Sequence, residues 1–330
     1  MRLGGTVYRF QGARWTNFMG PLYQSLERPI PTRQEETKQS EEKPKPEIVA
    51  ESLLMSWNEL EDWQKDNSFI VRGYRKLSGS YAASLSSVFA VHNQTCNIHS
   101  HLWGLFIFAL GAFDLWRKLP VQYSSFSTGD KIAFSCYFAG VFTCLSLSSA
   151  FHTLLNHSRA AWERFLLLDF LGILSLVAGS WIPGIYYGFF CMQAVSRFYW
   201  TMILSLSAGC AVVLCVPMFR THAWRTFRIT MFVLLGLCGL MPMTHAAIEY
   251  GMLEAHERGF GWYALEGIFY LSGALLYASK YPERLSPGTF DIVGSSHQLF
   301  HVLVLGGAWV HLNGIVKAFE YNHNPLTRQC

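Results

Sequence analysis

The sequence predicts an all-α membrane protein built as a bundle of seven transmembrane helices. Of its 330 residues, 51% are hydrophobic and only 15% are charged, whereas soluble domains carry about 25% charged residues. Beyond residue 97, apolar runs recur that are each long enough to cross a hydrocarbon core of about 30 Å. A soluble helical protein has difficulty burying so many runs. We therefore expect a multi-pass integral protein of the plasma membrane or an endomembrane.

The expected transmembrane domain covers residues 98–317, and a short C-terminal tail, 318–330, follows it. We expect the third span to break near Pro183, because proline lacks the backbone N–H that continues a helix. No internal repeat is evident, which argues against an inverted-repeat transporter. The expected spans are 98–116, 131–155, 165–188, 198–218, 226–247, 261–279 and 295–317.

Two segments precede the first span. Residues 1–50 include the run TRQEETKQSEEKPKPE, which is charged and has no large apolar side chain, so we expect a disordered cytosolic tail. Residues 51–97 form a pre-membrane segment, in which Leu53, Trp57 and Leu60 recur at helical spacing. This spacing predicts an amphipathic helix at the membrane interface. A short helix packed on the bundle is the alternative.

Basic residues at the ends of the spans predict a cytosolic N-terminus. Lys and Arg are more frequent in cytoplasmic loops than in outer loops. Seven spans then place the C-terminus outside, the reverse of the G-protein-coupled receptor arrangement. With the N-terminus inside, ten basic residues flank the inner ends (Arg72, Arg75, Lys76, Arg159, Arg164, Arg220, Arg225, Arg228, Lys280, Arg284) and six flank the outer ends (Arg117, Lys118, Lys131, Arg197, Arg258, Lys317).

Composition also excludes several classes of protein. The net charge is +4 with a pI near 8.6, but the basic residues sit at span ends, so nucleic acid is not an expected partner. The eight cysteines show no paired spacing and are interpreted as small apolar fillers. The N-terminal run MRLGGTVYRFQGARW lacks an apolar core, so no cleavable signal peptide is expected.

Polar residues within the apolar segments locate a candidate site. An imidazole inside a bilayer is costly and suggests function. His297 and His301 have i, i+4 spacing, which puts both on one helix face. The expected topology brings His152, at the end of the second span, and Asp169, early in the third, to the same depth. Three imidazoles and a carboxylate from distant segments should therefore meet near the inner side.

Three histidines and one open position are typical of catalytic zinc sites, whereas structural zinc sites use four protein ligands. Zinc would make hydroxide available near neutral pH, and Asp169 would either deprotonate the water or hold a ligand N–H. Ser148 lies one turn from His152. It would bind the water or a substrate carbonyl, or alternatively bond back to its own helix.

The remaining histidines are interpreted differently. His99 and His101 point about 200° apart on a helix, so they should not share a metal, and a polar interfacial role is expected. His311 lies roughly 15 Å along its helix from His301, in the outer half, and His245 lies near an outer end. The others fall in loops or at ends and should be solvated: His92, His157, His222, His256 and His323.

At these residues the chain resembles the progestin and adipoQ receptor (PAQR) family, which includes adiponectin receptors, haemolysin III-type proteins and fungal homologues. The similarity is greatest to the adiponectin-receptor and fungal branch. One departure is Gln94, where many relatives have Glu in an H-N-E-T run. The matching stretches are WQKDNSFIVRGYR, SVFAVHNQTCNIHSHLWGLFIF, SSAFHTLLNHSRAAWERFLLLDFLGI, GSWIPGIYYGFFC and YPERLSPGTFDIVGSSHQLFHVLVLGGAWVHLNGI.

The resemblance implies a zinc ion held by His152, His297 and His301 near the cytosolic side, with Asp169 at the water. It extends to alkaline ceramidases, whose Ser, Asp and three-His set matches Ser148, Asp169 and these histidines. Three functions follow. The first is a zinc-dependent hydrolase of a lipid amide such as ceramide. The second is a receptor that couples an extracellular ligand to the cytosol and contains a structural zinc. The third is a regulator of metal or sterol homeostasis.

Overall fold

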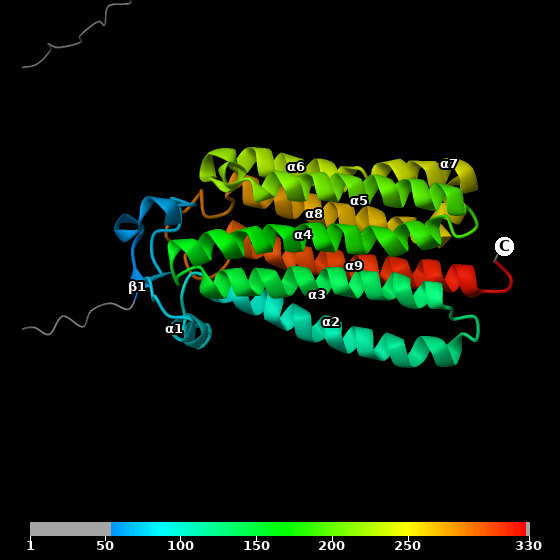
Figure 1. Ribbon diagram of the computed structural model, residues 1–330, viewed down its shortest axis with the longest axis horizontal. Coiled ribbons are helices and arrows are strands. Elements are labelled where there is room, and N and C mark those ends of the chain that lie inside the picture. Colours follow the sequence, from blue (N-terminus) through cyan, green and yellow to red (C-terminus); the bar gives the residue numbers. More distant parts are fainter. Residues whose placement is uncertain (1–53, 328–330) are drawn as a thin grey trace, which may run out of the picture. The chain divides into compact units, whose positions relative to one another are not determined.

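The computed structural model describes residues 54–327, and the expected N-terminal tail lies outside that range. Eight long helices follow a pre-membrane region of short elements (Figure 1). The short elements are β1 (Leu54–Met55), η1 (Trp57–Glu59), η2 (Asp62–Gln64), β2 (Tyr74–Arg75), α1 (Tyr81–Ser86) and η3 (Ser87–Phe89). The long helices are α2 (Thr95–Gln122), α3 (Thr128–Leu154), α4 (Arg159–Gly188), α5 (Gln193–Cys215), α6 (Arg225–Leu237), α7 (Leu240–Glu257), α8 (Phe260–Ser279) and α9 (Ser296–His323), with η4 (Pro217–Arg220) and η5 (His222–Trp224) between α5 and α6.

Within residues 54–327, six segments are long and apolar enough to cross a membrane: α2, α3, α4, α5, the stretch His222–Glu257 and α9. Each includes most of an expected span. Helix α8 matches the expected sixth span in position and length. Its Trp262, Glu266 and three tyrosines lower its mean hydropathy below that of the six segments. Helix α9 continues through His323, six residues beyond the expected end of the last span at 317.

The prediction of a break in the third span was wrong, because α4 runs unbroken through Pro183. Neighbouring side chains hydrogen-bond carbonyls in this turn. Trp200 Nε1 donates to the Ile182 oxygen at 3.1 Å, and His311 Nε2 lies 2.9 Å from the Ser180 oxygen. Such contacts are how membrane bundles tolerate proline within a helix.

The expected fifth span, 226–247, is divided in the structure. Helix α6 ends at Leu237 and α7 begins at Leu240. Pro242 has no N–H for the Cys238 carbonyl, which favours an interruption at that point. Gly239 lies against Trp181, where a Cβ would be 2.9 Å from the ring.

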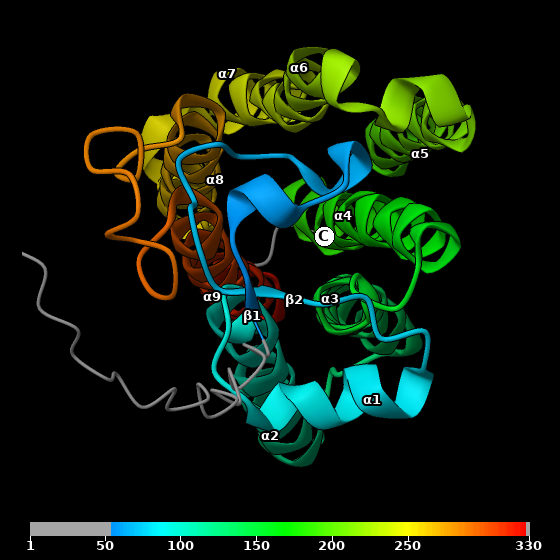
Figure 2. The same cartoon turned by 90° about the vertical axis from the view of Figure 1, so that its left-hand side faces the viewer.

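The pre-membrane segment is not the amphipathic helix that the spacing of Leu53, Trp57 and Leu60 predicted. Over the described part, β1 pairs antiparallel with β2, with Leu54 opposite Arg75, and the two 3-10 turns lie between them. Long-range bonds stabilise this path, because Trp57 N donates to the Val71 oxygen and Asp291 accepts from the backbone of Val71 and Arg72. Figure 2 shows this segment crossing one end of the bundle.

Helices α3 and α4 pack with their backbones in close contact. A Cβ on Gly140 would lie 3.2 Å from the Gly179 Cα, and one on Gly172 would lie 3.0 Å from the Cys144 Cα. Small residues permit this approach where membrane helices meet. One turn further along the same antiparallel register, Ser148 comes opposite Asp169.

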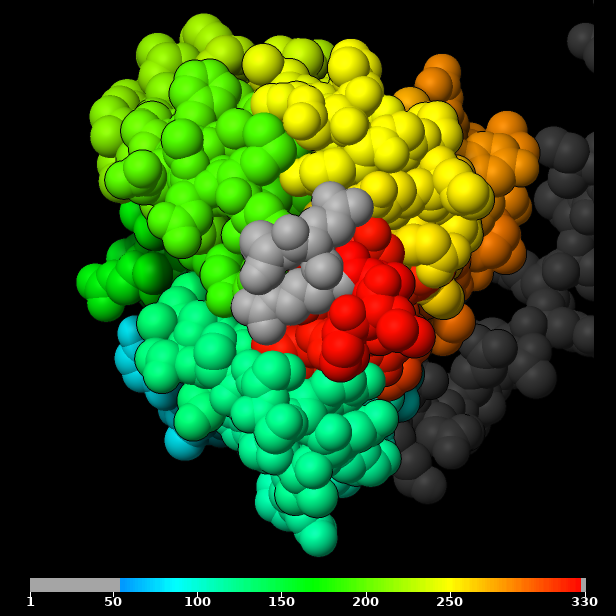
Figure 3. Space-filling model, turned by 90° about the vertical axis from the view of Figure 1, so that its right-hand side faces the viewer, coloured from blue at the N-terminus to red at the C-terminus, as the bar shows by residue number. Residues whose placement is uncertain are grey.

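Helix α9 is central and contacts α2, α4, α7 and α8. At the end opposite the pre-membrane segment, Figure 3 shows its red end surrounded by teal, green and yellow segments. There Asp130, fully buried, accepts from Tyr187 Oη at 2.9 Å and from His323 Nε2 at 3.1 Å. These bonds join α3, α4 and α9.

Cysteine usage matches the sequence interpretation only in part. Six cysteines in residues 54–327 are free thiols: Cys96, Cys136, Cys144, Cys210, Cys215 and Cys238. Cys191, in the connection between α4 and α5, is disulfide-bonded, which the lack of a paired spacing did not predict.

Candidate metal centre

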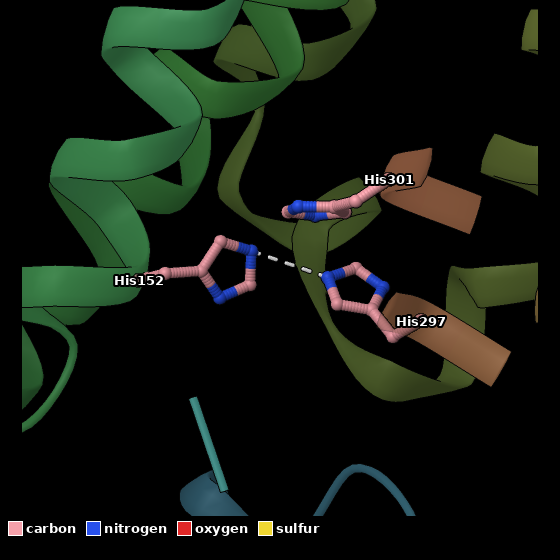
Figure 4. Close-up of side chains that lie close together, drawn as sticks. All are labelled: His152, His297 and His301. Carbon is pink, nitrogen blue, oxygen red and sulfur yellow. Dashed lines mark hydrogen bonds between the residues drawn. The ribbon is translucent and has the colours of Figure 1, made fainter. Parts of the chain in front are cut away.

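Three histidines predicted to share a depth meet at the end of the bundle beneath the pre-membrane segment. His152 lies in the last turn of α3, and His297 and His301 lie in the first two turns of α9 (Figure 4). His152 and His301 are each only 2% exposed, and His297 is partly buried. One ligand atom from each residue lies within 4.8 Å of the other two.

The separations suit a single metal ion. Nε2 of His152 and Nε2 of His297 are 3.2 Å apart. Two nitrogens bound to a tetrahedral zinc at about 2.0–2.1 Å would lie roughly 3.3 Å apart. The ring centroid of His301 lies 4.8 Å from that of His152 and 4.7 Å from that of His297. The donor set therefore fits zinc in both atom type and spacing.

The beginning of α2 fixes the outer nitrogens of two of these rings. His152 Nδ1 donates to Gln94 Oε1 at 2.8 Å, and His301 Nδ1 donates to the Asn97 carbonyl at 3.2 Å. An acceptor at Nδ1 leaves the lone pair on Nε2 of a neutral imidazole. Asn97 Nδ2 also donates to Gln94 Oε1 at 2.8 Å, which holds the amide in place. Both rings are thereby oriented as metal ligands.

Arg75, from β2, fixes the end of α3 that carries His152. Its guanidinium donates to the carbonyls of His152 at 2.6 Å and Thr153 at 2.9 Å, and to Ser87 Oγ at 2.6 Å. A cation at a helix C-terminus satisfies free carbonyls and opposes the helix dipole. Burial lowers the pKa of Arg75 to about 10, so it remains protonated at neutral pH.

The first turn of α9 is held by Glu283, which is fully buried. Its carboxylate accepts from Ser296 N at 2.7 Å, from the Ser296 hydroxyl and from Asn67 Nδ2 at 2.9 Å. A carboxylate at a helix N-terminus is favourable because backbone N–H groups there lack partners. This contact places His297 next to the end of α3.

Ser148 and Asp169 form a pair beside the histidines. Ser148 lies opposite Asp169 across the α3–α4 contact, close enough for its hydroxyl to act on the carboxylate. Ser148 is 2% exposed and lies one turn before His152. Asp169 is not in the group of close ligand atoms. The structure therefore brings together three candidate histidine ligands and a neighbouring Ser–Asp pair.

His101 belongs to this region, although the sequence predicted a polar interfacial role for it. It is 3% exposed, and its ring stacks on His301 with centroids 3.9 Å apart and planes at 11°. Neither of its ring nitrogens has a hydrogen-bond partner within the described range. His99 points away, and its Nε2 lies 2.9 Å from the Val88 oxygen.

Other histidines lie outside the cluster. His311 bonds to Glu266 at 2.7 Å in the bundle interior, and His245 bonds to Tyr199 at 3.0 Å. The expectation of solvated rings was wrong for His92, which is fully buried, and for His323, which pairs with Asp130.

The sequence interpretation did not assign Gln94, Asn97, His101 or Arg75 to the site. Their partners are far along the chain; Gln94 and His152, for example, are 58 residues apart. The available signal was the polar run HNQTCNIHSH at the start of a membrane helix. Such a density of hydrogen-bonding side chains at the end of a span indicates buried partners.

Comparison with protein families gives a match that spans the site. A family model described as haemolysin-III related matches residues 89–312, which include the three histidines, Ser148 and Asp169. The match therefore covers most of the described helices.

Individual relatives extend the similarity. The chain is 36% identical over 274 residues to "ADIPOR-like receptor IZH2" of Saccharomyces cerevisiae, covering 82% of this chain and 85% of the relative. It is 38% identical over 281 residues to the "Adiponectin receptor protein" of Drosophila melanogaster, covering 83% and 63% respectively. It is 34% identical over 262 residues to "Heptahelical transmembrane protein 1" of Arabidopsis thaliana, covering 78% and 79%.

Proposed function

This chain belongs to the haemolysin-III-related family of multi-pass membrane proteins, and from that premise we propose that it is a seven-span, zinc-dependent hydrolase of a membrane lipid amide such as ceramide. The observation that carries the proposal is the convergence of three imidazoles beside a neighbouring Ser–Asp pair. Three nitrogen ligands leave a fourth position open, which is the catalytic arrangement.

Seven spans require α8 to cross the membrane together with the six more apolar segments. Its 20 residues are long enough. Its tyrosines and Glu266 face partners in the bundle, since Glu266 bonds His311 and Tyr270 lies against Gly307 of α9. A relative named heptahelical supports the same count.

We place the metal end of this bundle in the cytosol, together with the N-terminus, following the excess of basic residues at that end. Tags that accept glycans, inserted before residue 97 and after residue 323, test this orientation. Only the C-terminal tag should be glycosylated. Glycosylation of the N-terminal tag would reverse the assignment.

Zinc bound here would polarise a substrate carbonyl and ease deprotonation of water. His152, His297 and His301 would hold the ion, with Gln94 and Asn97 fixing two of the rings. The Asp169 carboxylate would accept the proton of the attacking water, and Ser148 would fix its orientation. Water adds to the amide carbon, the C–N bond breaks and the amine nitrogen takes a proton, giving a fatty acid and an amine.

Fatty-acid release from short-chain ceramide by the detergent-purified protein tests the hydrolase directly. General acid–base assistance is typically worth about 10²- to 10⁴-fold, so Asp169→Asn should lose activity on that scale and keep its zinc. Asp114→Asn, an exposed carboxylate on α2, is the matched control. No release by zinc-loaded wild type from several amide and ester lipids would reject hydrolysis.

Zinc content is measured separately. The purified protein should hold about one zinc ion, and the double variant His297→Ala, His301→Ala should hold none, because a single imidazole remains. His256→Ala, exposed and remote, should retain it. A fully loaded double variant would show that the metal lies elsewhere.

Signalling is the second candidate, supported by the receptor names of the relatives. In that case zinc would have a structural role, and the protein would couple an extracellular ligand to the cytosol. Asp169→Asn would then lower the melting temperature, and neither protein would release fatty acid.

A further inference from the structure

A cavity lies at the metal end of the bundle, and none of the three clustered histidines lines it. Its volume is about 310 Å³. The first turns of α4, the η4–η5 connection and η2 enclose it. The lining residues used below are Trp63, Arg159, Trp162, Leu166, Met218 and Arg220.

The walls of this cavity are held by contacts between distant segments. Asp66, which follows η2, lies 3.1 Å from His222 Nδ1, and the Trp63 carbonyl lies 3.3 Å from His222 Nε2. The rings of Trp63 and Trp162 meet edge to face at 5.8 Å. The cavity is therefore part of the folded structure and joins the pre-membrane segment to the helices.

Its charged lining is positive overall. Arg159 and Arg220 face a single acidic lining residue, Glu163. Arg159 Nε pairs with the Glu163 carboxylate at 2.9 Å, whereas Arg220 Nη1 donates a hydrogen bond to the Glu163 backbone oxygen at 3.1 Å. Arg220 Nε has no partner within the described range. The Arg159 side chain is 68% exposed, so its remaining donors are accessible. Guanidinium groups are suited to binding phosphate, because their N–H donors match its oxygens.

The same cavity has an apolar side that faces the ends of membrane helices. Leu166 lies two turns into α4, and Met218, just beyond α5, is 52% exposed. Val216 beside it is 41% exposed. Tryptophan next to such residues is typical of the headgroup level of a bilayer. A ligand seated here would contact arginines at one end and hydrocarbon at the other.

We propose that this cavity binds an anionic glycerophospholipid of the adjacent leaflet, with its phosphate at Arg159 and Arg220 and an acyl chain along Leu166 and Met218. The charge of the lining selects against a zwitterionic headgroup, and the apolar side selects against a soluble phosphate. The proposal is independent of the hydrolase assignment.

The test uses delipidated protein in detergent, to which phosphatidylserine or phosphatidylcholine is added. Native mass spectrometry then measures how much of each lipid stays bound. The wild type should retain phosphatidylserine preferentially. A basic residue near an anionic surface contributes about 1 kcal/mol, so Arg159→Gln and Arg220→Gln should each weaken that binding roughly 5-fold. Arg164→Gln, an exposed change on the same helix but outside the lining, should leave it unchanged.

Three outcomes would overturn the proposal: equal retention of the two lipids, an equal loss in Arg164→Gln, or displacement of phosphatidylserine by glycerol phosphate at matched concentration. The last would identify a site for soluble phosphate. If Arg220→Gln fails to fold, Arg159→Gln decides alone, because among the described residues Arg159 pairs only with an exposed Glu163 in its own helix. Melting temperatures of all variants check their folding.

Discussion

Gln94 accepts a hydrogen bond from His152 across the α2–α3 contact, with 2.8 Å between Oε1 and Nδ1. The partner of the ring here is an uncharged amide. It sets the tautomer of the ring without adding negative charge to the ligand set. Gln94 is therefore a positioning residue for the metal centre.

Replacing Gln94 with Leu should weaken zinc binding about 10- to 100-fold, the usual effect of losing such a partner. Gln94→Glu should preserve or strengthen binding, because a carboxylate increases the basicity of the ligand. Competition with a zinc chelator measures both, and Gln193→Leu, exposed on α5, is the control. Equal affinities in Gln94→Leu and wild type would remove Gln94 from this role.

His101→Phe should not lower the melting temperature. The variant keeps a ring to stack on His301 and removes two buried nitrogens that lack partners in the described structure. An unsatisfied buried polar group costs about 1–3 kcal/mol. Zinc affinity should stay near that of the wild type, because His101 is outside the ligand group. Loss of zinc would instead identify His101 as a ligand.

Gly179→Ala should destabilise the bundle. The new Cβ would lie 2.6 Å from the Cys136 oxygen and 3.0 Å from the Gly140 Cα, and backbone atoms cannot rotate away. Overpacking of this kind costs typically 1–3 kcal/mol. Gly209→Ala on α5, where the Cβ meets nothing within 4 Å, should be neutral or slightly stabilising. Thermal unfolding in one detergent compares the two, and similar shifts would contradict the close α3–α4 contact.

Acid should destabilise the protein partly through His92. Burial, together with the charges of Arg75 and His99, lowers the pKa of His92 to about 4 despite its contact with the Ser87 carbonyl. Between about pH 6.5, where an unfolded histidine titrates, and about pH 4, only the unfolded chain binds this proton, so stability falls as pH falls.

His92→Gln should therefore flatten the decline of the melting temperature across that range. His256→Gln, exposed and remote, should leave the decline as in the wild type. Parallel declines in wild type and His92→Gln would show that other groups account for the acid sensitivity.

The convergence of His152 with His297 and His301 was predictable because it depends on depth alone. Once apolar lengths fix the spans, the end of one helix and the start of another must share a side of the membrane. The i, i+4 spacing then fixes the common face.

Other features depend on contacts between distant residues, which local patterns do not encode. The pre-membrane segment has helical spacing, yet it follows bonds such as Trp57 N to Val71. Gln94 and His101 face the site only because α2 packs against α3 and α9. The division at Cys238–Gly239 had a local signal in Pro242, whereas Pro183, a similar signal, interrupts nothing because the neighbouring helices accommodate it.

The metal centre takes its ligands and their supports from α2, α3 and α9, the first, second and last long helices of the chain. During synthesis on the ribosome, α2 and α3 therefore enter the membrane long before His297 and His301 have been translated. An ion held by all three imidazoles could bind only after the last helix has been inserted, so metal loading would be a maturation step that follows synthesis. A nascent chain arrested before residue 297 offers a single imidazole of the three, so added metal would not restore the site in a prematurely terminated protein.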